Sequence, residues 1–229
     1  MTKKDRSRVW VRWTGEALII VASVFIAIYL EGVADDSARS DDAHAAMVQL
    51  LSELRADQED LRAVREQQLT LRDAYDDLLG WFAEPERLPG DSVQAALDEI
   101  AFLNRTMYPR RGTWRALTSS DQLTWVTDRS LVTRLANFYE STNARLEYAG
   151  RDYDFNVNDV LRGVATRAWD SYRLRSSAAG NDHLPELREQ LRYLRLAWNE
   201  YYVDLLDDYG AELRTLIRDL ETYLAATNT

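Results

Sequence analysis

Residues 10–29 read WVRWTGEALIIVASVFIAIY, and this stretch decides how the rest of the chain is interpreted. Its apolar core, residues 17–30, carries no charge and a single aliphatic hydroxyl, that of Ser23. As a helix, the stretch would be roughly 28 Å long, close to the thickness of a bilayer's hydrocarbon core. Aromatic residues stand at both ends, as they do at membrane interfaces. The sequence therefore predicts a transmembrane helix over residues 14–34.

The charges on either side predict an orientation. Five basic residues lie within residues 1–13, opposed there only by Asp5, whereas Asp35 and Asp36 follow the apolar core. Lys and Arg stay on the cytoplasmic side of a membrane. We therefore expect a single-pass protein of the bacterial inner membrane, with a cytoplasmic basic tail and residues 35–229 forming a periplasmic domain.

A cleaved signal peptide is the alternative interpretation. The basic start, the 14-residue apolar core and Gly32-Val33-Ala34 before Asp35 all fit one. Glu31, just before that site, argues against cleavage, so a retained signal-anchor is preferred. Under either interpretation most of the chain is exported.

Composition limits the classes of partner. Residues 35–229 carry 23 basic and 35 acidic side chains, a net charge of −12. Such a domain repels nucleic acid and anionic lipid headgroups. The chain has no cysteine, which excludes a disulfide framework, thiolate metal sites and Fe–S clusters.

One apolar seam with helical 3-4 spacing runs from Ser37 to Phe82, interrupted only by Asp57 and Gln68. Its members are Met47, Leu50, Leu54, Leu61, Val64, Leu71, Tyr75, Leu78 and Phe82. The seam predicts a helix, roughly 70 Å long, that packs against a partner helix in the same chain or in another copy. Since neither Gly nor Pro follows Gly32 before the seam, the span and this helix should form one continuous rod.

The same spacing predicts further helices over 93–103, from 113, over 129–174 and over 185–225. The core face of the third is assigned to Leu131, Leu135, Phe138, Thr142, Leu146, Ala149, Tyr153, Val160 and Val164. That of the last is assigned to Leu187, Leu191, Leu194, Trp198 and Tyr201 or Tyr202, and then, after a register shift, to Leu206, Tyr209, Leu213, Leu216, Leu220 and Tyr223. The expected fold is all-α, with one N-terminal transmembrane helix followed by an elongated antiparallel helical bundle.

Inside the predicted span, polar and small residues gather on one side. Successive steps of 100° bring Glu16, Ser23, Ala27, Glu31 and Ala34 within about 80° of each other. A carboxylate facing lipid is costly, so this side is predicted to be an intramembrane partner face. The alternative is that both glutamates lie at headgroup depth and are solvated.

No catalytic, cofactor or metal site is predicted. His44 follows Asp41 and Asp42, but two acids and one histidine at a polar helix start indicate a solvated face rather than a metal site. Neighbouring acids such as Asp207 and Asp208 diverge on a helix and are poor acid/base dyads. The sequence contains no P-loop, GxGxxG or HExxH motif.

The chain is rich in aromatic residues, and two interpretations remain open. A ligand pocket or the bundle core could be lined by Trp114, Trp125, Trp169, Trp198 and the pair Tyr201–Tyr202. At helical spacing the core is the preferred interpretation.

Two stretches resemble a group of bacterial single-span anchored proteins of unknown function. The first is Gly15-Glu16 with LIIVASVFIAIYLE, continued by residues 47–55; the second comprises residues 113–120 and 131–139. The group's anchor often has a tryptophan after the acidic residue, where this chain has Gly32-Val33. The resemblance implies an exported helical bundle and no known activity.

We therefore expect a non-enzymatic, membrane-anchored interaction protein, acting as an accessory or scaffolding subunit on the periplasmic face of a larger membrane complex, of the respiratory or photosynthetic type. Its expected partners are other subunits of that complex and the bilayer, through one span. A periplasmic ligand-sensing bundle is the alternative, weakened because no second span or cytoplasmic output domain is found. Self-assembly into a homo-oligomer through the seam is a further alternative.

Overall fold

The computed structural model describes residues 3–84, 90–165 and 184–227. Within them, the side chains left undescribed are those of residues 3–22, 24–28, 30, 32–34, 90, 102, 103 and 164. All regular elements in the described ranges are helices, so the all-α prediction is confirmed.

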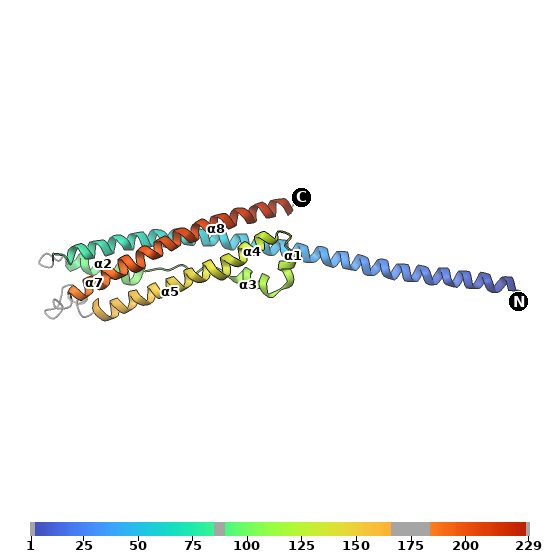
Figure 1. The fold of residues 1–229 in the computed structure, drawn as a ribbon, viewed down its shortest axis with the longest axis horizontal. Helices are drawn as coiled ribbons and strands as arrows, with labels where there is room; N and C mark the ends of the chain where they lie inside the picture. The colour runs from blue at the N-terminus through green and yellow to red at the C-terminus, as the bar shows by residue number, and fades with distance from the viewer. Residues whose placement is uncertain (1–2, 85–89, 166–183, 228–229) are drawn as a thin grey trace.

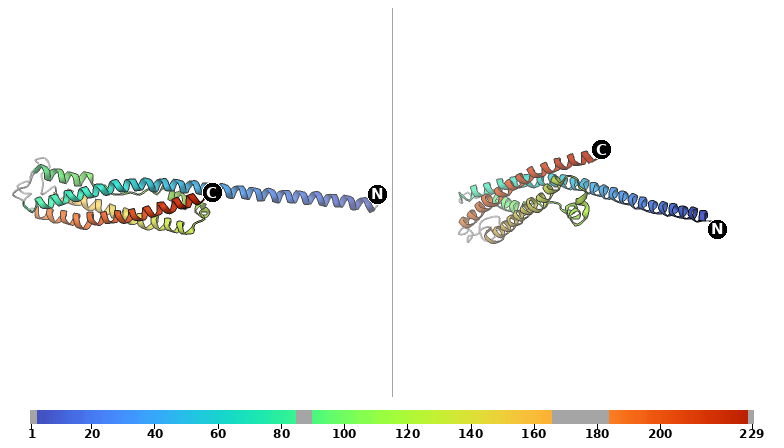
Figure 2. Two further views of the ribbon diagram at one scale, coloured as in Figure 1. Left: turned by 90° about the horizontal axis from the view of Figure 1, so that it is seen from above. Right: turned by 45° about the vertical axis from the view of Figure 1, so that its right-hand side comes forward.

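Helix α1, Lys3–Trp81, is a single element of 79 residues, about 120 Å long. Its N-terminal half runs out of the bundle as a lone helix (Figures 1 and 2). Residues 35–42 are exposed, and Ala43 is the first buried side chain among those described for α1. The prediction that one rod joins the apolar segment to the bundle is therefore confirmed for the backbone.

Two more rods complete the bundle, and all three lie side by side (Figure 1). The second consists of α4 (Arg129–Asn137), η3 (Phe138–Thr142), α5 (Asn143–Val160) and η4 (Leu161–Ala165). The third consists of α7 (Leu184–Tyr193), η6 (Leu194–Asn199) and α8 (Glu200–Thr227). Ion pairs Arg55–Glu221 (2.8 Å) and Asp76–Arg195 (2.9 Å) show that α1 and the third rod are antiparallel.

Shorter elements cover one side of the bundle. Helix α2 (Gly90–Leu103) folds back along α1 and begins three residues before the predicted start. An extended segment, residues 104–111, then leads to α3 (Gly112–Ser119) and the 3₁₀ turn η2 (Asp121–Trp125). The last two lie at the end of the bundle from which the N-terminal half of α1 emerges.

All nine seam residues of α1 are buried, at 0–6% exposure. They pack against α8, α2 and the shorter elements of the same chain. The two interruptions, Asp57 and Gln68, are also fully buried. The sequence left open whether the seam packs against a helix of the same chain or of another copy. In the structure it packs against helices of the same chain.

Three π-helical turns correct the predicted core faces. Across each turn two core residues stand five positions apart: Phe138 and Asn143 with the buried Tyr139 between them, Val160 and Ala165, and Leu194 and Asn199. A π turn contains one extra residue, so the core position moves on by one.

The predicted core positions one residue earlier are therefore displaced. Thr142 and Trp198 were assigned to the core but are only half-buried, and the side chain of Val164 lies outside the described residues. Asn143 and Asn199 take their places with no exposed surface. Beyond the third turn Tyr202 is buried and Tyr201 is 40% exposed, which decides between those two.

Helix ends follow the expected chemistry where they are described. Asp128 caps α4, accepting a 2.9 Å hydrogen bond from the backbone N–H of Leu131. Residues 166–174 of the predicted helix 129–174, which include Trp169, lie outside the described residues.

Candidate functional site

The most distinctive feature of the bundle is the extended segment 104–111, which lies against α1, α5 and α8. Thr106, Met107 and Pro109 are buried, although the segment forms no helix. A buried backbone without secondary structure must find other hydrogen-bond partners. Polar side chains from all three rods supply them, and these side chains form the polar interior of the protein.

Asp57, on α1, binds one end of the segment. Its carboxylate accepts the backbone N–H of Arg110 at 3.0 Å and the Arg110 Nη1 at 2.6 Å. Burial raises the pKa of this carboxyl from 3.8 to about 6, although the Arg110 guanidinium and N–H act in the opposite direction. One turn earlier, Glu53 accepts hydrogen bonds from the backbone N–H and hydroxyl of Thr113.

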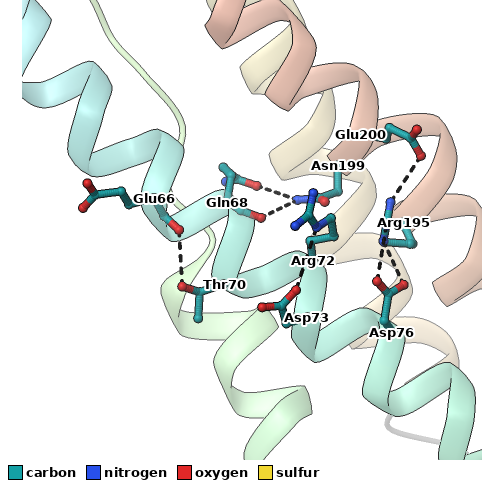
Figure 3. A network of polar contacts seen from close by, with 9 residues as sticks. All are labelled: Glu66, Gln68, Thr70, Arg72, Asp73, Asp76, Arg195, Asn199 and Glu200. Carbon is teal, nitrogen blue, oxygen red and sulfur yellow. Dashed lines mark hydrogen bonds and ion pairs between the residues drawn. The ribbon is translucent and has the colours of Figure 1, made fainter.

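Gln68 binds the other end and joins it to the third rod. Its Nε2 donates to the Asn104 Oδ1 (3.1 Å) and to the carbonyl of Arg105 (2.8 Å). Asn199 Nδ2 donates to the Gln68 carbonyl (3.1 Å) and Oε1 (3.0 Å), which Figure 3 shows from close by. Beside this pair, Arg195 bridges Asp76 and Glu200 at the surface.

The middle of the segment is bound by α5 and α8. Asp154 accepts hydrogen bonds from Asn104 and from Thr106, each at 2.8 Å. The Tyr202 hydroxyl accepts the backbone N–H of Met107 at 2.8 Å. Partial burial raises the pKa of Asp154, and burial raises that of Tyr202 beyond its normal range.

These contacts explain why polar residues occupy core positions. Leaving one buried donor or acceptor unsatisfied costs about 1–3 kcal/mol, so each anchor contributes appreciably to stability. Their hydrogen bonds are directed at the protein's own backbone. These side chains hold residues 104–111 against the three rods, so their role is structural. We call residues 104–111 the strap.

Gly150 on α5 permits the close approach of the strap. A Cβ there would lie 3.1 Å from the Thr106 Cβ and 3.2 Å from the Tyr202 hydroxyl oxygen. Helix α5 continues through Gly150, so the glycine serves packing.

We predict that Gly150→Ala destabilises the bundle by about 1–2 kcal/mol, because overpacking costs about 1–3 kcal/mol and the gain in helix propensity returns only part of it. Gly80→Ala is the matched control, since a Cβ there meets nothing within 4 Å; it should be neutral or stabilise by up to about 1 kcal/mol. Urea unfolding followed by circular dichroism measures both. Equal effects would contradict the packing role.

Other buried polar groups lie near Asp57. The hydroxyls of Tyr139 and Tyr209 and the carboxamide of Asn143 have no hydrogen-bond partner among the described residues. Burial raises the pKa of both tyrosines far above the normal range. Neutral phenols of this kind do not act as bases or nucleophiles near neutral pH.

The residues singled out in the sequence do not converge on one site. Ser23 and Glu31 are exposed on α1, while the side chains of Glu16 and Ala27 lie outside the described residues. His44 Nδ1 lies 3.2 Å from the Thr227 hydroxyl. No group of three metal-binding side chains is found in the part of the chain that the structure describes.

The described aromatic residues also lie in different parts of the structure. Trp114 stacks on Tyr139 with ring centroids 5.0 Å apart. Trp125 lies under the Arg39 guanidinium at 5.9 Å, and Tyr202 packs against Tyr153 at 5.7 Å. The preferred prediction of bundle core therefore holds for Trp114 and Tyr202, which are buried.

Among the described residues, no helix has a stretch long and apolar enough to cross a membrane. The predicted span 14–34 falls outside the described side chains except for Ser23, Tyr29 and Glu31.

Fold and site together define an all-α protein: an antiparallel bundle of three rods, fastened by an internal strap and extended by one long helix. No known protein family, no curated protein and no solved structure matches this chain.

Proposed function

We propose that the chain is a membrane-anchored, non-enzymatic interaction protein, an accessory or scaffolding subunit on the periplasmic face of a larger membrane complex. The observation that carries this proposal is the continuity of α1. One helix joins the basic tail, the apolar segment 17–30 and the bundle. The N-terminal half of the helix backbone lies away from the bundle (Figure 2).

An apolar stretch held away from its own core calls for other apolar surroundings. A bilayer fits its length, and the charges on either side favour a periplasmic bundle. A continuous helix would also hold the bundle at a fixed height above the membrane. That geometry suits a subunit that docks on a neighbour better than a domain on a flexible tether.

The polar interior supports a role in binding rather than catalysis. Asp57, Gln68, Asp154, Asn199 and Tyr202 direct their hydrogen bonds at the strap or at each other. Catalysis needs acid, base or nucleophilic groups placed to meet a substrate. Groups used in this way hold the fold instead.

The experiment is purification of the full chain from native membranes in mild detergent, followed by sizing and identification of the chains that accompany it. Recovery in a large complex at fixed stoichiometry is the expected result. Recovery as a lone monomer or dimer would contradict the proposal. That outcome would favour the ligand-sensing alternative, to which a surface groove between α4 and α8 lends support.

We predict that replacing Ser23 and Ala27 together by Leu reduces the amount of complex several-fold, because larger side chains overfill a face packed on a neighbouring helix. Ala22→Leu is the matched control, since it makes a similar enlargement on the other side of the helix. The readout is the fraction of the chain that co-purifies with its partners. If the double variant assembles as well as the control, the partner face has been assigned to the wrong side.

A further inference from the structure

The surface between the second and third rods contains a groove of about 390 Å³, lined by α4, η3 and α8. Its floor is formed by the side chains of Phe138 and Leu216, each 3% exposed. Ala211 and Thr215, one turn apart on α8, form a low wall, and their small side chains leave the space open. The groove is distinct from the strap and from α1.

The floor is held in place by the core beneath it. The ring of Phe138 packs on Tyr209 at 5.1 Å and edge-on to Tyr139 at 5.5 Å between centroids. Each of these two tyrosine side chains is only 1% exposed. An apolar floor that cannot easily shift is preorganised for a ligand, which lowers the cost of binding.

Both ends of the groove are bridged by polar contacts between the rods. At one end Arg134 Nε lies 2.9 Å from Asp219 Oδ2. At the other, the Thr142 hydroxyl donates to Glu212 at 2.7 Å. The two bridges are about 12 Å apart, counted from Arg134 to Thr142 along the helix. They obstruct the path of a helix from another protein, whereas a small molecule fits between them. The volume lies at the lower end of the range for small-molecule sites.

The charges at the rim select the kind of molecule. Glu212 and Asp219 are acidic, and the guanidinium of Arg134 is engaged by Asp219 and by the Ser130 hydroxyl. The lining residues therefore carry one net negative charge, that of Glu212, which also interacts electrostatically with the exposed Arg145 outside the groove. A cation is attracted to such a rim and a carboxylate is repelled.

We propose that this groove binds a small apolar molecule carrying a protonated amine. The apolar body lies on Phe138 and Leu216, and the ammonium group lies beside Glu212, at the end of the groove that Thr142 bridges. This binding does not depend on whether the chain is anchored in a membrane or belongs to a larger complex.

The test uses three probes with one apolar body and different end groups: 4-phenylbutylamine, 4-phenylbutan-1-ol and 4-phenylbutyrate. The full chain in detergent is titrated with each, and saturation-transfer NMR and the melting temperature are followed, with empty micelles as the blank. A ligand that binds only the folded state must raise the melting temperature. The amine should bind saturably, at least tenfold more tightly than the carboxylate, with the alcohol between them. Equal affinities of the amine and the carboxylate would overturn the charge assignment.

Two variants locate the site. Ala211→Trp places a large side chain in the groove from an exposed position of α8, and it should weaken amine binding at least tenfold. Ala225→Trp is the matched control, an exposed position on the same helix outside the groove, and it should bind as the parent does. Glu212→Gln tests the charge separately and should reduce the preference for the amine over the alcohol. The proposal would be overturned if Ala211→Trp bound the amine as tightly as the parent does. It would also be overturned if none of the three probes bound the parent chain.

Discussion

A chain lacking Ala197 is expected to fold almost as well as the parent, whereas a chain lacking Asp204 is expected to unfold. Both residues are exposed and both belong to the third rod. Ala197 lies within the π turn η6, where core residues Leu194 and Asn199 stand five positions apart. Its removal restores the four-residue spacing of an α-helix and leaves the core face continuous on both sides.

Asp204 lies in regular α-helix between Val203 and Leu205, which are both buried. Its deletion rotates everything after it by about 100° relative to the first half of the rod. Straightening η6 could restore the later core face only by displacing Asn199 and Tyr202, which anchor Gln68 and the strap. Each buried leucine lost from the core costs about 2–5 kcal/mol, which together exceeds the stability of a typical domain.

Urea unfolding of the two full-length deletion variants, followed by circular dichroism, measures this difference. We expect the Ala197 deletion to change the free energy of unfolding by less than about 2 kcal/mol, and the Asp204 deletion to leave no cooperative transition. If both deletions were tolerated equally, the core of the third rod would not depend on register. If the Ala197 deletion unfolded the chain, the π turn itself would be required.

The seam of α1 could be predicted because its apolar residues keep one α-helical register from Met47 to Phe82, so their spacing identifies the buried face. The second and third rods were predicted as helices, but their core faces were displaced by one residue at Thr142 and Trp198. A π turn is invisible to a fixed period, since the spacing before and after it is regular, but it shifts the register between the two parts. The register shift predicted in the last helix was such a signal, although it was placed after Tyr201 or Tyr202 and the π turn comprises residues 194–199.

The strap shows a different limit. Asp57 and Gln68 were recognised as interruptions of the seam, and a polar residue at a core position implies a buried partner. The partner could not be identified, because residues 104–111 reach these side chains through tertiary packing and carry no periodic pattern of their own. The packing role of Gly150 could not be predicted either, since its close contact with Thr106 depends on a segment more than 40 positions away.

Acidification is expected to stabilise the parent chain relative to Asp57→Asn. The pKa of Asp57 is raised from 3.8 to about 6 in the folded protein, so the folded state binds this proton more tightly than the unfolded state does. The contribution of Asp57 to the free energy of unfolding is therefore greatest below about pH 4. It falls as the pH rises through the window between 4 and 6, and is constant above it.

The size of the effect follows from the same shift. Each factor of ten in proton affinity corresponds to about 1.36 kcal/mol, so the difference between pH 4 and pH 7.5 is at most about 3 kcal/mol. Asparagine keeps the shape of the side chain but does not titrate. The stability difference between the parent and Asp57→Asn should thus grow in favour of the parent as the pH is lowered, measured by urea unfolding at several pH values.

The sign of this change decides between two opposed physical effects. The Arg110 guanidinium, 2.6 Å from the carboxylate, favours the ionised form, whereas burial of Asp57 favours the neutral form. If the ion pair were dominant, the parent would lose stability relative to Asp57→Asn on acidification, which is the opposite result. Arg110→Gln provides a second measurement: without the guanidinium, burial acts unopposed by charge, and the titration of Asp57, followed by ¹³C NMR of its carboxyl, should move to higher pH. Because Arg110 also lies in the strap, the same titration would report how firmly the 104–111 segment is held against α1.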